Sequence, residues 1–175
     1  MAIIDLPMAG KICLVTGATA GIGEATASGL ASLGATVILA GRNIERCSAS
    51  VERIKQWTRN PEIAYLVADL SSQREVRRLA DEFKTRYARL DVLVNNVGAI
   101  NLARRFTEDG IELTFALNHL SYFLLTDLLI DLMISSAPAR IVNVSSSSHR
   151  QIGMNLENLQ GQGRYRGFRA YAQSK

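Results

Sequence analysis

The sequence predicts a doubly wound α/β domain built on a parallel sheet. Apolar runs of strand length alternate with helical patterns along the chain, and a glycine-rich turn directly follows the first apolar run. Parallel strands covered by helices on both faces form near-continuous apolar runs, and these runs are mainly apolar. We expect strands at 12–16, 36–40, 63–67, 92–95 and 141–144, separated by helices at 22–33, 43–57, 72–87 and 112–134.

Individual residues place several element boundaries. Gly34 is positioned to end the first helix, since glycine is common just beyond a helix C-terminus. Ser71 or Ser72 with Glu75 predicts a capping box at the start of the third helix. The run 141–144 has the mainly apolar pattern of a buried central strand, but the sequence offers no sixth strand to pair with its far side, so an unpaired apolar edge is expected. Residues 151–169 have no clear period, which indicates an extended loop before a helix that carries Tyr171.

The glycine-rich turn at 16–23 reads Thr-Gly-Ala-Thr-Ala-Gly-Ile-Gly. A strand, a glycine turn and a helix in this order present backbone N–H groups and the positive helix end to a pyrophosphate. Gly17 suits the tight turn, Gly21 allows close approach to the backbone, and Gly23 lets the helix pack closely on the sheet. The spacing differs from the commoner Gly-x-Gly-x-x-Gly, and an ordinary turn is the alternative.

Tyr171 and Lys175 lie four residues apart at the end of the chain. On a helix this spacing places both side chains on one face, about a turn apart. A fixed cation beside a phenol stabilises the phenolate and lowers the phenol pKa toward neutrality. The pair is therefore a candidate for proton transfer, although the same spacing occurs by chance in many helices.

These two motifs, taken together, resemble the pattern of the short-chain dehydrogenase/reductase family, which has Thr-Gly-x-x-x-Gly-x-Gly early and Tyr-x-x-x-Lys late. Further family marks follow in order: Asp69-Leu70, Asn95-Asn96-Val97-Gly98, Asn118 and Ser145-Ser146. The stretches 116–120 and 158–161 resemble the retinol dehydrogenase-like branch of that family.

The resemblance implies a Rossmann fold and hydride transfer between a nicotinamide and a carbonyl or alcohol substrate, with apolar aldehydes or ketones such as retinoids as candidates. Tyr171 would be the general acid/base, and Lys175 would lower its pKa and hold the nicotinamide ribose. Ser146 would polarise the substrate oxygen, with Ser145 as the alternative. Asn118 would hold a water that links the lysine to solvent; a capped or water-satisfied amide is the alternative.

The cofactor contacts that the resemblance implies follow the same motifs. They are Gly17, Thr19, Gly21, Ile22, Gly23, Arg42, Asp69, Leu70, Asn95, Gly98, Tyr171 and Lys175. NADP is favoured over NAD, because the second strand is followed by Arg42 and no carboxylate, so a 2′-phosphate would be attracted there. Arg42 as a surface charge and Asp69 as a loop-opening residue are the alternatives.

Composition fits a single domain over residues 1–175, with 47% hydrophobic and 21% charged residues and 3 prolines. Residues 1–10 lack the pattern of a secretory signal, and the apolar run 123–134 is too short to span a bilayer and contains two aspartates. We therefore expect a cytoplasmic protein without a transmembrane segment. The two cysteines are interpreted as reduced thiols.

Other function classes have weaker support. The net charge of +4 and the arginines at 164, 166 and 169 are interpreted as a solvated loop and not as a nucleic-acid site, since no binding motif accompanies them. His119 and His149 have no ligand partners at metal-site spacing. The sequence around Ser146 lacks the glycines of a hydrolase nucleophile elbow.

In the family the sheet continues for two more strands beyond the Tyr-x-x-x-Lys helix, whereas this sequence ends at Lys175. The expectation is therefore a fragment with five strands, inactive alone, whose full-length form is a homo-oligomer. A domain that binds NADPH or docks a partner without turnover is the alternative function.

Overall fold

The computed structural model contains one five-stranded parallel sheet with the strand order β3-β2-β1-β4-β5. It describes residues 6–175; residues 1–5, part of the stretch considered above as a leader, lie outside the described residues. The strands are β1 (Ile12–Thr16), β2 (Thr36–Gly41), β3 (Ile63–Val67), β4 (Val92–Asn95) and β5 (Arg140–Asn143). The strand order reverses beside β1, as in a doubly wound Rossmann fold, so the predicted fold class is confirmed.

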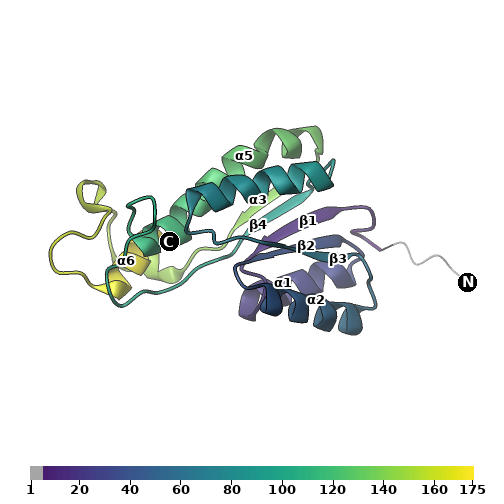
Figure 1. Ribbon diagram of the computed structural model, residues 1–175, viewed down its shortest axis with the longest axis horizontal. Helices are drawn as coiled ribbons and strands as arrows, with labels where there is room; N and C mark the ends of the chain where they lie inside the picture. The colour runs from purple at the N-terminus through teal and green to yellow at the C-terminus, as the bar shows by residue number, and fades with distance from the viewer. Residues whose placement is uncertain (1–5) are drawn as a thin grey trace, which may run out of the picture.

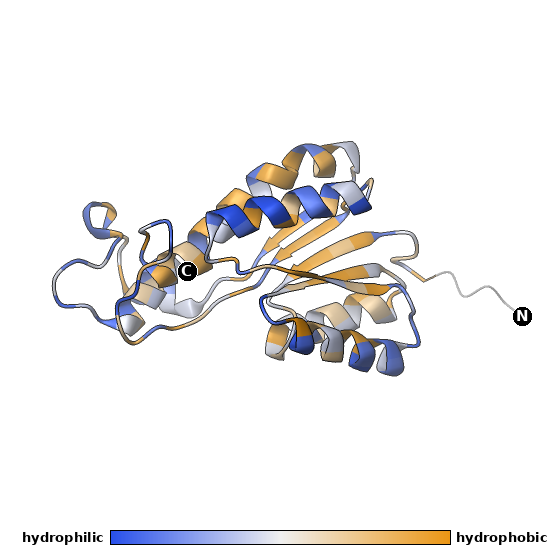
Figure 2. Cartoon of the chain, in the orientation of Figure 1, coloured by the Kyte–Doolittle hydropathy of each residue, from blue (hydrophilic) through white to orange (hydrophobic). Residues whose placement is uncertain are grey.

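Helices cover both faces of the sheet (Figure 1). On one face lie α1 (Gly21–Ser32) and α2 (Ile44–Thr58), and on the other lie α3 (Gln73–Arg86) and α5 (Ser121–Ser135). Side chains of β1 alternate between the two layers: Leu14 packs with the core under α3 and α5, whereas Cys13 and Val15 pack under α1 and α2. Figure 2 shows the strands as an apolar band between these layers.

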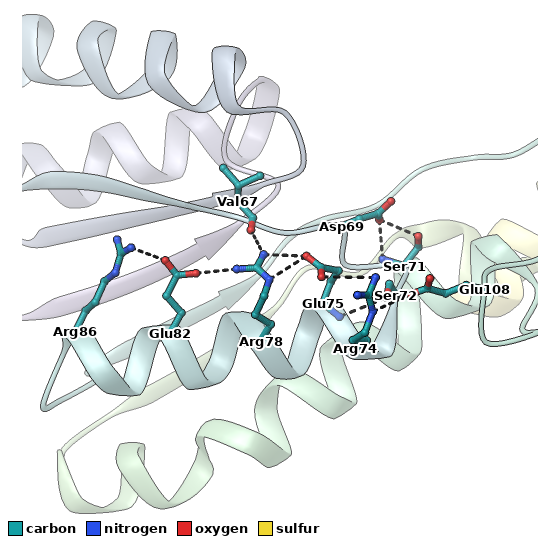
Figure 3. Close-up of polar contacts among 10 residues, drawn as sticks. All are labelled: Val67, Asp69, Ser71, Ser72, Arg74, Glu75, Arg78, Glu82, Arg86 and Glu108. Atoms are coloured by element: carbon teal, nitrogen blue, oxygen red, sulfur yellow. Dashed lines mark hydrogen bonds and ion pairs between the residues drawn. The ribbon is translucent and has the colours of Figure 1, made fainter.

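Most predicted boundaries agree with the structure to within a residue or two. Gly34, with φ +92°, follows the C-terminus of α1 as expected. At the start of α3, only half of the predicted capping box forms. The Ser72 hydroxyl accepts from the Glu75 N–H at 3.3 Å, but the Glu75 carboxylate pairs with Arg78 at 2.8 Å and does not cap Ser72 (Figure 3).

The prediction of one continuous α-helix at 112–134 is wrong, because a π-helical turn interrupts it. The structure has α4 (Leu113–Phe115), a π-helical turn at Ala116–Leu120, and then α5. The stretch is mainly apolar on both sides of this turn, so its pattern does not reveal the wider i to i+5 spacing of a π turn. The loop expected at 151–169 contains a short 3₁₀ turn, Leu156–Asn158, and ends where α6 (Gly167–Ser174) begins.

One helical stretch, Leu113–Ser135, is long and apolar enough, by length and composition alone, to cross a membrane. Three of its residues, Leu125, Leu129 and Met133, are buried in the core beside α3. Part of its apolar surface is therefore used to build the domain.

The unpaired apolar edge expected at 141–144 is confirmed. β5 is an edge strand, and within residues 6–175 no strand pairs with its outer side. Its residues are exposed, Ile141 by 37% and Val142 by 47%. An exposed apolar edge offers unpaired backbone groups to another chain.

A polypeptide of residues 1–175 is therefore expected to self-associate through β5. Analytical ultracentrifugation should detect species larger than the 19.1 kDa monomer. The variant Val142→Lys should shift the distribution toward monomer, because a charged side chain on an edge strand opposes pairing. Ile134→Lys, at an exposed apolar position on α5, is the control. An unmodified chain that sediments only as a 19.1 kDa monomer would contradict this expectation.

Asp91 joins the amino ends of three strands. Its carboxylate is 2% exposed and accepts from Lys11 Nζ at 3.0 Å, from Arg89 Nε at 2.8 Å and from the Ile12 N–H at 2.9 Å. Its main-chain carbonyl accepts from the Arg140 N–H at 2.8 Å. Burial acts to raise the Asp91 pKa, but the hydrogen bonds from Arg89, Ile12 and Lys11 outweigh it and lower the pKa to about 2.

Asp91→Asn is expected to lower the free energy of unfolding by about 1–3 kcal/mol at neutral pH, because it removes charge-assisted hydrogen bonds. A lowered folded-state pKa stabilises the fold above the ordinary value of 3.8, and that contribution is lost as the pH falls toward about 2. Urea unfolding of both proteins across this range measures the difference. A difference that does not shrink on acidification would refute the electrostatic origin.

Candidate active site

The predicted site residues gather at one edge of the sheet. The glycine turn follows β1, the stretch 95–98 follows β4, and the serines 145–146 follow β5. Carboxyl ends of neighbouring parallel strands meet at the same edge, beside the point where the strand order reverses. A ligand crevice is expected there in folds of this kind.

The glycine turn is shaped by close contacts. A Cβ at Gly17, where φ is +64°, would lie 2.8 Å from Val97 Cα, and a Cβ at Gly23 would overlap the Gly17 carbonyl. Gly21, with φ +57°, instead faces open space. The α1 N-cap residue, Ala20, offers no side-chain cap to the first N–H groups of the helix. The turn is therefore compact on its sheet side and open on its outer side.

Asn96, which the sequence reasoning did not select, ties this turn to β4. Its Nδ2 donates to the Thr16 carbonyl at 2.8 Å and to the Gly17 carbonyl at 3.2 Å. The Thr16 hydroxyl accepts from the Asn96 N–H at 2.9 Å and the Val97 N–H at 3.1 Å. The signal was present in the sequence, since Asn96 lies within the same four-residue motif as Asn95.

Asn95 is not brought together with the other predicted cofactor residues. It is fully buried, and its Nδ2 donates to Asn143 Oδ1 at 2.9 Å and to the Thr126 hydroxyl at 3.1 Å. Its side chain therefore joins β4 to β5 and α5, away from the glycine turn.

The predicted adenosine end is more dispersed. Arg42 directly follows β2, is exposed, and makes no hydrogen bond or ion pair within residues 6–175. Ile22 is 69% exposed, whereas Leu70 is 5% exposed and packs in the core. The Asp69 carboxylate accepts from the Ser71 N–H at 3.0 Å and the Ser71 hydroxyl at 2.8 Å, as a loop-opening aspartate does (Figure 3). The Thr19 methyl lies against Gly41.

Gly98, Asn118 and Lys175 meet at the other end of the site. A Cβ at Gly98 would lie 3.1 Å from Lys175 Nζ and 3.3 Å from Asn118 Oδ1. Asn118 lies in the π turn and is 2% exposed; its amide exchanges 2.9 Å hydrogen bonds with both backbone groups of Ala99 and donates to the Ser174 hydroxyl at 2.9 Å. π turns are frequent at functional sites. Asn118 therefore fixes the 98–99 loop to α6.

The Lys175 ammonium is held by a residue outside the predicted set. Nζ donates to the Tyr122 hydroxyl at 2.8 Å and to the Val144 carbonyl at 3.2 Å, and lies 4.7 Å from the centroid of the Tyr122 ring. Burial lowers the pKa of Lys175 to about 8 and, together with the charge of Tyr171, raises the pKa of Tyr122. Tyr122 lies four residues after Asn118, a spacing that places both on one helix face.

Tyr171 and Ser146 lie on neighbouring segments. Tyr171 is half-buried on α6, which packs against the 3₁₀ turn Ser147–Gln151. Ser146 caps that turn, and its hydroxyl accepts from the Ser148 N–H at 3.2 Å and donates to the Ser148 hydroxyl at 3.1 Å. Ser145 donates to the Lys175 carbonyl at 2.8 Å. Within the described residues, no hydrogen bond joins the Tyr171 hydroxyl to Lys175 or to either serine.

A family model described as short chain dehydrogenase matches residues 11–158 of this sequence. The chain belongs to the short-chain dehydrogenase/reductase family. Human polyprenol dehydrogenase is 42% identical over 173 residues, which cover 97% of this chain and 52% of that protein. Human retinol dehydrogenase 13 is 41% identical over 167 residues, 95% of this chain and 50% of that protein. The resemblance to the retinol dehydrogenase-like branch is thus confirmed.

This family member spans about half the length of the curated relatives it matches. Among solved structures, RhlG of Pseudomonas aeruginosa in an active-site complex with NADP is 31% identical, with a TM-score of 0.75 over 97% of this chain and 64% of that chain. The short-chain dehydrogenase/reductase fold therefore extends over nearly the whole chain.

Proposed function

We propose that this chain forms the cofactor-binding half of an NADP-dependent oxidoreductase that transfers hydride between a nicotinamide and a carbonyl or alcohol substrate. The observation that carries the proposal is the joint position of two features at one sheet edge. These are the glycine turn, open at Gly21, and the cluster of Gly98, Asn118 and Lys175.

The residues fit a dinucleotide. The uncapped N–H groups at the start of α1 suit a pyrophosphate, and the missing side chain at Gly98 leaves Lys175 accessible to a ribose. Arg42 supports NADP over NAD, since its guanidinium is exposed and a 2′-phosphate carries the opposite charge. The NADP complex of the structural neighbour from Pseudomonas aeruginosa supports the same choice.

The bound nicotinamide would supply or accept the hydride. Tyr171 would donate its hydroxyl proton to the substrate oxygen as charge develops there, and take it back in the oxidative direction. Lys175 would hold the ribose with its ammonium. Ser146 would donate to the substrate oxygen after its hydroxyl turns away from Ser148, and Asn118 would hold a proton-relay water.

The names of the two human relatives refer to retinol and polyprenol, both long apolar alcohols. We propose apolar alcohols and the matching aldehydes or ketones as the substrate class. The test is a turnover assay of the active protein that carries these residues, with NADPH and an apolar aldehyde, followed by the nicotinamide absorbance. A protein that binds NADPH but reduces no apolar carbonyl would overturn the substrate class.

A second candidate is an NADPH-binding domain without turnover. The observation that favours it is the set of hydrogen-bond partners at the site. The Lys175 ammonium donates to Tyr122 and the Ser146 hydroxyl donates to Ser148. Among the described residues, neither group is hydrogen-bonded to the Tyr171 hydroxyl. NADPH binding without oxidation of any alcohol or reduction of any carbonyl would favour this candidate.

A further inference from the structure

Tyr122 belongs to none of the motifs that define the site, yet it makes the shortest contact of the Lys175 ammonium. It lies on the first turn of α5 and is half-buried. Its ring lies under Nζ, and its hydroxyl is 2.8 Å from Nζ. Both the π face and the hydroxyl oxygen of a tyrosine attract a cation.

The direction of these hydrogen bonds can be assigned. A phenol has one proton to donate, and the Tyr122 hydroxyl lies 2.6 Å from the Val97 carbonyl, which can only accept. The proton of Tyr122 is therefore committed to Val97, and its lone pairs accept from Lys175. Because Val97 directly precedes Gly98, this chain of contacts joins the lysine to the loop that borders the glycine turn.

The ammonium has three N–H donors. One points to Tyr122 and a second to the Val144 carbonyl, so among residues 6–175 one N–H has no partner, on a nitrogen that lies against Gly98. We propose that Tyr122 is a positioning residue: it fixes the Lys175 ammonium beside Gly98 so that the remaining N–H is presented to the nicotinamide ribose. This inference rests on the function proposed above.

The same geometry separates the roles of two tyrosines near one lysine. Tyr122 cannot serve as the proton donor to a substrate, because its proton is bound to Val97 and burial raises its pKa. Tyr171, half-buried and without such a bond among the described residues, is left to act as the acid. Tyr122 thus acts through Lys175 and not on the substrate.

The groups around the lysine are few. A cavity of about 470 Å³ is lined by Tyr122 and Lys175 and also by His119 and Asp127 of the same helical stretch. Within residues 6–175, neither His119 nor Asp127 forms an ion pair with Lys175. Tyr171 on α6 is the other titratable group nearby. Of these groups, only Tyr122 hydrogen-bonds to the ammonium.

The test measures how readily the Lys175 amine is acetylated, by competitive acetylation of the 175-residue chain with limiting acetic anhydride. Only neutral amines react, so the yield on the peptide 170–175, relative to the exposed Lys84, reports the neutral fraction of Lys175 at each pH. Tyr122→Phe keeps the ring but removes the acceptor that stabilises the charged form. The Lys175 pKa should fall, and relative acetylation below pH 8 should rise by about threefold to tenfold.

Tyr65→Phe, on the edge strand β3, is the matched control and should leave the ratio unchanged. An unchanged ratio in Tyr122→Phe would overturn the proposal. If thermal unfolding shows that this variant does not fold, nuclear Overhauser effects are measured in the unmodified chain instead. Effects between the Lys175 ε-methylene and the Tyr122 ring support the proposal, and their absence overturns it.

The acetylation readout uses no dinucleotide, so the two failures are distinguishable. If Tyr122→Phe raises the acetylation ratio but the unmodified chain does not bind NADPH, the proposed function is overturned and the Tyr122–Lys175 contact is supported. In the active protein that carries these residues, Tyr122→Phe should raise KM for NADPH by about tenfold and affect kcat less. A kcat loss with unchanged KM would overturn the role assigned to Tyr122.

Discussion

Tyr171→Phe is expected to lower turnover by at least about 100-fold in the active protein that carries these residues, with NADPH affinity nearly unchanged. The variant removes one hydroxyl, the proton donor, and almost no contact area, and a positioned acid or base typically contributes about 10²–10⁴-fold. Steady-state kinetics with an apolar aldehyde, together with a separate NADPH titration, measure both effects.

Tyr87→Phe is the control, because Tyr87 caps the far end of α3 and packs on Phe83. It should keep both turnover and affinity. If Tyr171→Phe retained unmodified turnover across the pH range, another group would have to be the acid, and the roles separated above for Tyr122 and Tyr171 would be wrong.

Arg42→Asp is expected to weaken NADPH binding by about 10–100-fold and to reverse the preference toward NADH. A guanidinium paired with a phosphate contributes a charge-assisted hydrogen bond, about 1.5–3 kcal/mol, and a carboxylate at the same position repels the 2′-phosphate but accepts from a 2′-hydroxyl. Calorimetric titration of each dinucleotide measures the change.

Arg77→Asp, an exposed change of equal charge on α3, is the matched control. It should alter both affinities little, since long-range charge effects are screened in salt. An equal loss of NADPH affinity in both variants would show that overall charge, and not Arg42, sets the preference.

The sequence was sufficient to predict the fold, because strand-length apolar runs and glycine boundaries depend on local chemistry. All five strands lie within a residue of the expected ranges. The exposure of β5 was predicted by counting strands and not from its own residues. An apolar run by itself indicates burial, but no sixth strand was expected beside this one, and Val142 is exposed in the structure.

The positions of site residues could be predicted where a motif fixes the backbone. The hydrogen-bond partners of their side chains could not be predicted in the same way. The glycine turn and the meeting of Gly98, Asn118 and Lys175 follow from motif positions at strand ends. At the glycine turn the side chain of Asn96, and not that of Asn95, makes the hydrogen bonds. The Lys175 ammonium likewise bonds to Tyr122 and not to Tyr171. Both outcomes depend on which way each side chain points. The π turn at Asn118 was not predicted, because the mainly apolar helical pattern continues on both sides of it.

We expect the carboxyl edge of this sheet to bind NADP. Titration of NADPH and NADH into the 175-residue chain by calorimetry tests it most directly, with the Gly23→Ala variant as the control, since a Cβ there would overlap the Gly17 carbonyl. We predict saturable binding of NADPH, weaker binding of NADH, and loss of both in Gly23→Ala. Tighter binding of NADH would contradict the role of Arg42, and binding of neither dinucleotide would contradict the proposed function itself.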